Sequence, residues 1–220
     1  MLQRGGPEGT KDMRSNIYSG TEERILDEQM IPGLGSIEKK LVKLESDRDA
    51  VMQLSKDLIR MSGKAIAAMH AKGSAIPNST IMELKECKAR LVRIEKGFEY
   101  YSMQAHQEFS EAMILYNILL NKEIPGMGSI GETEVPYLLG LMDVVGELKR
   151  EAIESMRRAD KDAAKGYYAI MSDIYDSTLH MRFASSVLPD FRRKQDTARI
   201  QVESVMNEML HLDIGPAAKL

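Results

Sequence analysis

Residues 104–119 decide the fold; they read Gln104-Ala-His-Gln-Glu-Phe-Ser-Glu-Ala-Met-Ile-Leu-Tyr-Asn-Ile-Leu119. The second half is apolar nearly all round, which is typical of a helix buried inside a protein. At about 100° per residue, Glu108 and Glu111 lie on the same face as the leucines that follow them. A carboxylate pushed into apolar surroundings is costly unless it is paired or holds a metal. The stretch therefore predicts an interior helix that carries two acids of functional interest.

Apolar residues recur at helical spacing on both sides of this stretch, and clusters of Gly and Pro separate the helical segments. Alternating runs of β-branched residues, the signature of strands, are missing. Ser36 is the expected N-cap of the first long helix and Thr133 opens the fourth. We predict an all-α bundle or array of about six long antiparallel helices, over residues 36–71, 77–96, 98–121, 133–159, 162–184 and 189–211.

The N-terminal part differs in amino-acid composition from the rest of the chain. Residues 1–34 mix Gly and Pro with many polar residues, which predicts a flexible arm with a short helix at 21–30. The remainder of the 220 residues is long enough to bury a sizeable core, so we expect residues 35–220 to form one helical domain.

Composition excludes several classes of protein. The chain is 43% hydrophobic and 29% charged, which excludes a disordered or fibrous protein. Cys87 is the only cysteine, so a disulfide framework and a cysteine-built zinc site are excluded. The absence of an apolar run of ~20 residues and of a signal-peptide pattern predicts a cytoplasmic protein without a membrane partner.

A second pair of acids stands in the helix expected at 133–159. Asp143 and Glu147 share one face, with Arg150 and Glu154 on the same stripe. The plain interpretation is a solvated helix face with Glu147 and Arg150 as a surface ion pair. The alternative is metal-assisted phosphodiester cleavage. Mg²⁺ prefers oxygen ligands, polarises a phosphate and activates water, and an acid outside the metal site can act as general base.

The net charge of −3 means that nucleic acid would have to bind to a local basic surface. Arg192, Arg193 and Lys194 form the densest basic cluster, and Arg150 adds another cation. Such a cluster is either a solvated face or a contact for the backbone of a single strand.

The helix with the second acid pair resembles a known family. The segment Tyr137–Arg150, Tyr-Leu-Leu-Gly-Leu-Met-Asp-Val-Val-Gly-Glu-Leu-Lys-Arg, is similar to the translin superfamily, and most similar to its catalytic branch, translin-associated factor X. The segment Gln107-Glu-Phe-Ser-Glu-Ala112 looks like the acidic pair of that branch, and Asp143 with Glu147 looks like its second pair. The stretch 188–195 and the helix after it resemble the C-terminal helix of translins. The resemblance covers about residues 36–212.

The resemblance implies an all-helical protomer that assembles into a closed, octamer-like homo-oligomeric shell. It also implies binding of single-stranded RNA or DNA, and endoribonuclease activity with Mg²⁺ or Mn²⁺. The metal and catalytic carboxylates would be Glu108, Glu111, Asp143 and Glu147. Translins carry a basic stretch where this chain has residues 99–106, and only His106 matches it. His106 is either a nucleic-acid contact or a histidine satisfied by neighbouring groups.

Two other functions stay open at this point. One is a translin-like binder of single-stranded RNA or DNA that catalyses nothing. The other is a di-iron carboxylate bundle, which requires two Glu-x-x-His motifs, whereas the chain has a single one at Glu208 and His211.

Overall fold

The computed structural model describes residues 31–72 and 76–214, and in these ranges the chain forms helices and no strand. The all-α prediction is confirmed. None of the helices in the described ranges is long and apolar enough to cross a membrane. The helices are α1 (Leu34–Lys72), α2 (Asn78–Ile94), α3 (Glu99–Asn121), α4 (Met127–Ile130), α5 (Glu134–Arg157), α6 (Lys161–Thr178) and α7 (Phe191–Ile214).

The chain divides into two units, Met1–Lys43 and Leu44–Leu220. In the first unit the structure describes residues 31–43 only, so the short helix expected at 21–30 and most of the arm expected at 1–34 lie outside the described residues. Gly33 has a positive φ of 89°, and α1 begins directly after it. The amide of Ser36 donates to the carbonyl of Gly33 at 3.1 Å, so Ser36 lies in the first turn and is not the N-cap.

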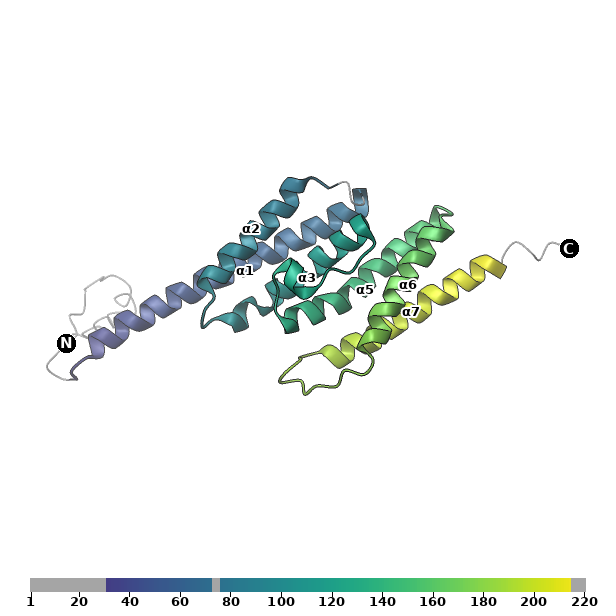
Figure 1. Ribbon diagram of the computed structural model, residues 1–220. Coiled ribbons are helices and arrows are strands. Elements are labelled where there is room, and N and C mark those ends of the chain that lie inside the picture. The colour runs from purple at the N-terminus through teal and green to yellow at the C-terminus, as the bar shows by residue number, and fades with distance from the viewer. Residues whose placement is uncertain (1–30, 73–75, 215–220) are drawn as a thin grey trace, which may run out of the picture. The chain divides into compact units, whose positions relative to one another are not determined.

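In the second unit, α5 lies between α3 and the antiparallel pair α6 and α7 (Figure 1). Helix α5 packs on several sides because its buried residues are distributed around its circumference. They include Leu139, Val144, Val145 and Leu148. The predicted interior helix is α3, in which an unbroken run from Phe109 to Leu115 is buried. The core of this unit is therefore built around α3 and α5.

The connection between α3 and α5 returns the chain to the start of α3. His106, near that start, contacts Glu132, just before α5, with 2.8 Å between Nδ1 and Oε1. Consequently α3 and α5 run in the same general direction (Figure 1), which corrects the antiparallel arrangement for this pair. The returning segment also contains the short helix α4, at Met127–Ile130, where the sequence predicted only a loop.

Helix α6 ends at Thr178 and does not continue to residue 184 as predicted. The last carbonyl groups of a helix lack helical partners. Here the carbonyl of Thr178 accepts a hydrogen bond of 2.7 Å from Nε2 of Gln195 on α7. The contact binds the end of α6 to α7, and residues 179–190 connect the two helices outside helical structure.

Candidate functional site: a carboxylate cluster between α3 and α5

Helix α5 lies close against α3 at Gly140. A Cβ atom placed on Gly140 would lie 2.6 Å from the Cβ of Ser110 and 2.8 Å from the carbonyl oxygen of Gln107. Only glycine allows this approach without a shift of one helix. Because Gly140 lies one turn before Asp143, and Ser110 lies between Glu108 and Glu111, the contact brings the two acid pairs to the same level.

The four acids, Glu108, Glu111, Asp143 and Glu147, are called the carboxylate cluster below. Glu111 is only 8% exposed. Burial, and after it the negative charges of Asp143, Glu108 and Glu147, together raise the pKa of its carboxyl group to about 8. The pKa of Glu108 is raised by burial first and then by the charge of Asp143. The acids of α3 and α5 thus share one electrostatic environment with an excess of negative charge.

Side chains from two other helices bind the carboxylate of Asp143. Its Oδ2 accepts a hydrogen bond of 2.7 Å from Nε2 of Gln107 on α3. Its Oδ1 forms an ion pair with the ammonium group of Lys194 on α7. Lys194 therefore points into the carboxylate cluster and away from its neighbours in the predicted basic cluster. Successive helical residues point about 100° apart, so Lys194 and the two arginines before it cannot share one face.

Glu147 is bound by a histidine that the sequence analysis did not identify. Nε2 of His70, near the end of α1, contacts Oε2 of Glu147, and Nδ1 contacts Oε1 of Glu151 at 2.6 Å. The side chain of His70 is 4% exposed and that of Glu147 is 27% exposed. The partner of Glu147 is therefore His70 and not Arg150, and this part of α5 is not a solvated face. Glu151 lies one helical turn after Glu147, and this spacing could have indicated that the two share a face. Nothing near His70 in the sequence indicated its role.

His106 has two glutamate partners as well. Its ring contacts Glu132 and Glu95, each at 2.8 Å. Burial lowers the pKa of His106, but the hydrogen bonds and charges of the two glutamates outweigh burial and raise it. His106 is buried between these partners. It is therefore placed as a histidine satisfied by neighbouring groups.

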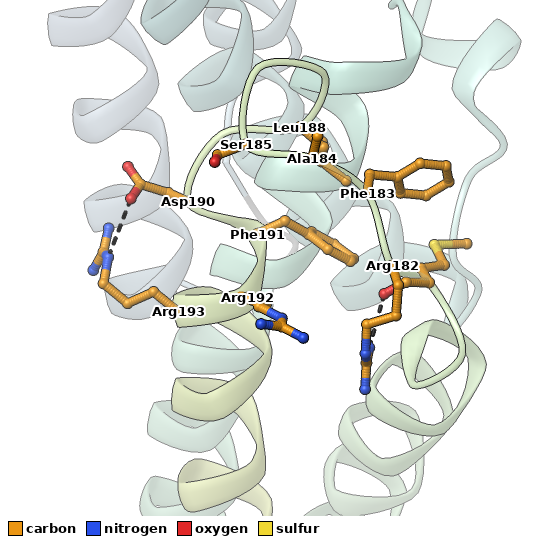
Figure 2. A pocket seen from close by; sticks show the side chains of 10 residues that line it. Arg182, Phe183, Ala184, Ser185, Leu188, Asp190, Phe191, Arg192 and Arg193 are labelled. Atoms are coloured by element: carbon orange, nitrogen blue, oxygen red, sulfur yellow. Dashed lines mark hydrogen bonds and ion pairs between the residues drawn. The ribbon is translucent and has the colours of Figure 1, made fainter.

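Arg192 and Arg193 lie at a cavity of about 410 Å³ beside the connection from α6 to α7 (Figure 2). Arg182 also lines this cavity and was not identified from the sequence. Phe183 points outward at its edge and is 58% exposed (Figure 2). The cavity combines cationic groups with an exposed aromatic ring, the two features that bind single-stranded nucleic acid.

Arg150 lines a second cavity of about 520 Å³, together with Lys149 and Arg158. His70 and Glu151 lie in the same wall, so this cavity adjoins the side of α5 that carries Glu147. Three cations at its edge can contact phosphate groups, although Glu154 also lines it and pairs with Arg158 at 3.7 Å.

The donor set of the carboxylate cluster suits a hard divalent cation. Among the described residues, no three His, Cys, Asp or Glu side chains are close enough together to hold a metal as they stand. Mg²⁺ does not require such a cage, because it keeps several waters and uses one or two carboxylates. Glu208 and His211, the single Glu-x-x-His motif, are both exposed on α7, so the structure gives no support to a di-iron site.

The chain and its fold are similar to known proteins. The translin family matches residues 46–214. An uncharacterised protein of Methanocaldococcus jannaschii is 28% identical over 174 residues, which are 77% of this chain and 78% of that protein. The crystal structure of apo-NeC3PO is similar with a TM-score of 0.75 and 22% identity, over 82% of this chain and 97% of that one. The structure of an AfC3PO–duplex RNA complex is similar with a TM-score of 0.69 and 21% identity, over 84% and 99% of the two chains.

Proposed function

Because the chain belongs to the translin family, we propose that it is a metal-dependent endoribonuclease that cleaves RNA at the carboxylate cluster. The single observation that carries the proposal is the crowding of four carboxyl groups between α3 and α5, where burial and the neighbouring negative charges raise the pKa of Glu111 to about 8. A divalent cation would offset the repulsion among these carboxylates, which is otherwise costly in a buried site.

The four acids would hold Mg²⁺ or Mn²⁺. When bound, such an ion supplies charge stabilisation at the phosphate and lowers the pKa of water. A cluster carboxylate outside the metal's coordination shell would accept the proton of the attacking water. Gln107 and Lys194 orient the Asp143 carboxylate, since each binds one of its two oxygens.

The cationic cavities provide a path for the RNA backbone. We propose that Arg150, with Lys149 and Arg158, contacts phosphates next to the cluster. Arg192 and Arg193, with Arg182, would contact the strand further along, where Phe183 offers a face for base stacking. The substrate proposed from the family resemblance is single-stranded RNA. One similar structure holds duplex RNA, so duplex RNA is the second substrate to test.

We also propose that the protein works as a cytoplasmic homo-oligomer. Leu34, Ile37 and Leu41 lie on one face of the first part of α1 and are 40–59% exposed. An apolar helical stripe of this kind is typical of a surface that packs against another copy. Sedimentation of the purified protein measures the assembly.

The cleavage test replaces the acid pair of α3. The double variant Glu108→Gln, Glu111→Gln keeps the size of both side chains but removes two carboxyl groups that can bind a cation. We expect it to abolish Mg²⁺-dependent cleavage of labelled RNA and to sediment as the parent does. EDTA should abolish cleavage by the parent.

The chain offers a matched control. Glu83 and Glu86 on α2 have the same Glu-x-x-Glu spacing but are exposed. The variant Glu83→Gln, Glu86→Gln should cleave at the parental rate. Cleavage by the first double variant as fast as by the parent would show that the assigned site is wrong.

The ion pair between Lys194 and Asp143 favours a second candidate function, a binder of single-stranded RNA or DNA without chemistry. It leaves Asp143 with both oxygens engaged by protein groups. This function predicts salt-sensitive RNA binding by the parent, and no product with Mg²⁺ or Mn²⁺.

A further inference from the structure

We propose that His70, together with Glu151, is a positioning group that fixes the Glu147 carboxylate for metal binding. The role of Glu147 rests on the function proposed above, and the experiment below separates the two proposals. His70 reaches α5 from the end of α1, 77 residues away in the chain. Its side chain is almost completely buried and each of its ring nitrogens contacts a carboxylate.

The geometry explains why a histidine lies at this position. Glu147 and Glu151 are one helical turn apart on α5, and two negative charges at this spacing repel each other. The His70 ring contacts both of them, with Oε2 of Glu147 on Nε2 and Oε1 of Glu151 on Nδ1. The ring thus lies between the two carboxylates, with one nitrogen on each. Glu151, with a side chain that is 10% exposed, fixes the orientation of the ring from the side opposite Glu147.

This arrangement leaves one side of Glu147 available. His70 binds Oε2, and the Glu147 side chain is 27% exposed. The other oxygen can therefore face a cation while the carboxylate is held in place. Groups that hydrogen-bond to metal ligands orient them, and their removal typically lowers metal affinity by about tenfold to a hundredfold.

His106 provides an internal comparison. It is bound by two glutamates in the same way, at 2.8 Å on each ring nitrogen, and it is also buried. Its partners Glu95 and Glu132 are not among the charges that raise the pKa of Glu111 or of Glu108, whereas Glu147 is. The two histidines therefore make the same kind of contact, but only His70 contacts the carboxylate cluster.

The experiment compares His70→Leu, His70→Gln and His106→Leu in the full chain. Mn²⁺ affinity is measured by calorimetry, thermal stability by circular dichroism, and kcat and KM with labelled RNA. We expect His70→Leu to weaken Mn²⁺ binding by about tenfold or more and to lower kcat with little change in KM. His70→Gln keeps one N–H donor and should recover part of the affinity. His106→Leu should lower the melting temperature but leave Mn²⁺ affinity within about twofold of the parent.

Parental Mn²⁺ affinity in folded His70→Gln and His70→Leu would overturn the proposal, and so would an equal loss of affinity in His106→Leu. If His70→Leu does not fold, the Mn²⁺ affinities of His70→Gln and Glu151→Gln are compared with that of the parent. Parental affinity in both variants would overturn the proposal. A parent that binds Mn²⁺ but cleaves no RNA would contradict the proposed function and leave the result for His70 intact. Parental affinity in Glu147→Gln would remove the premise that Glu147 is a ligand.

Discussion

At the scale of single residues, Glu111 links the fold to the proposed chemistry. Its pKa is about 8 in the folded protein against an ordinary value of 4.5. Between these pH values the folded protein holds a proton that the unfolded chain has released, so stability falls as pH rises from about 5 to about 8. Glu111→Gln cannot ionise. As pH rises over this range, the melting temperature of the variant in EDTA should therefore fall less than that of the parent. At about pH 9 the variant should have the higher melting temperature of the two.

The measurement is thermal unfolding at a series of pH values without metal. Glu83→Gln on the exposed face of α2 serves as the control and should follow the parent. Parallel curves for the parent and Glu111→Gln would contradict the raised pKa. Added Mg²⁺ should stabilise the parent most at the alkaline end, because metal binding requires ionised ligands.

At the scale of elements, the crossing of α3 and α5 depends on Gly140. Replacing it with Ala places a methyl group 2.6 Å from Ser110 Cβ and 2.9 Å from the Glu111 amide nitrogen. Overpacking of this kind costs about 1–3 kcal/mol. We expect Gly140→Ala to destabilise the protein by that amount in urea unfolding, and to reduce cleavage beyond what the loss of stability explains because the two acid pairs separate.

Gly166 on α6 is the matched control. A Cβ atom there meets nothing within 4 Å. Because Ala is a better helix former than Gly, Gly166→Ala should stabilise the protein by about 0.5–1 kcal/mol. Equal effects of the two substitutions would show that the close approach at Gly140 is not what sets the helix distance.

At the scale of the whole molecule, the cationic cavities should determine how RNA affinity depends on salt. For single strands, the slope of log affinity against log salt changes by about 0.7 for each phosphate contact. The variant Arg182→Ser, Arg192→Ser should reduce this slope by about 1.4 if both guanidinium groups contact phosphate. Fluorescence anisotropy with labelled RNA in EDTA measures binding without cleavage.

Arg60→Ser is the control for this measurement, because Arg60 on α1 is ion-paired with Asp57 at 2.6 Å. It should leave the salt dependence unchanged. An unchanged slope in the double variant would place the RNA away from the connection between α6 and α7.

The sequence by itself determined the helical class and most helix bounds, because the spacing of apolar residues and the Gly and Pro breaks are local signals. The interior helix at 104–119 and the two acid pairs could be identified for the same reason. Local signals failed where a distant contact decided the outcome. Helix α6 stops at Thr178, where Gln195 binds its last carbonyl, and Ile37 and Leu41 have helical spacing but remain exposed.

Only the tertiary structure decided which charged side chains meet. Lys194 turns from the predicted basic cluster to Asp143, His106 is enclosed by two glutamates, and His70 reaches Glu147 across 77 residues of chain. Such pairs form because burial makes an unpaired charge costly, and the partner is whichever group the packing of helices brings near. Spacing along one helix shows which residues share a face, whereas the packing of α1, α3, α5 and α7 sets what that face contacts.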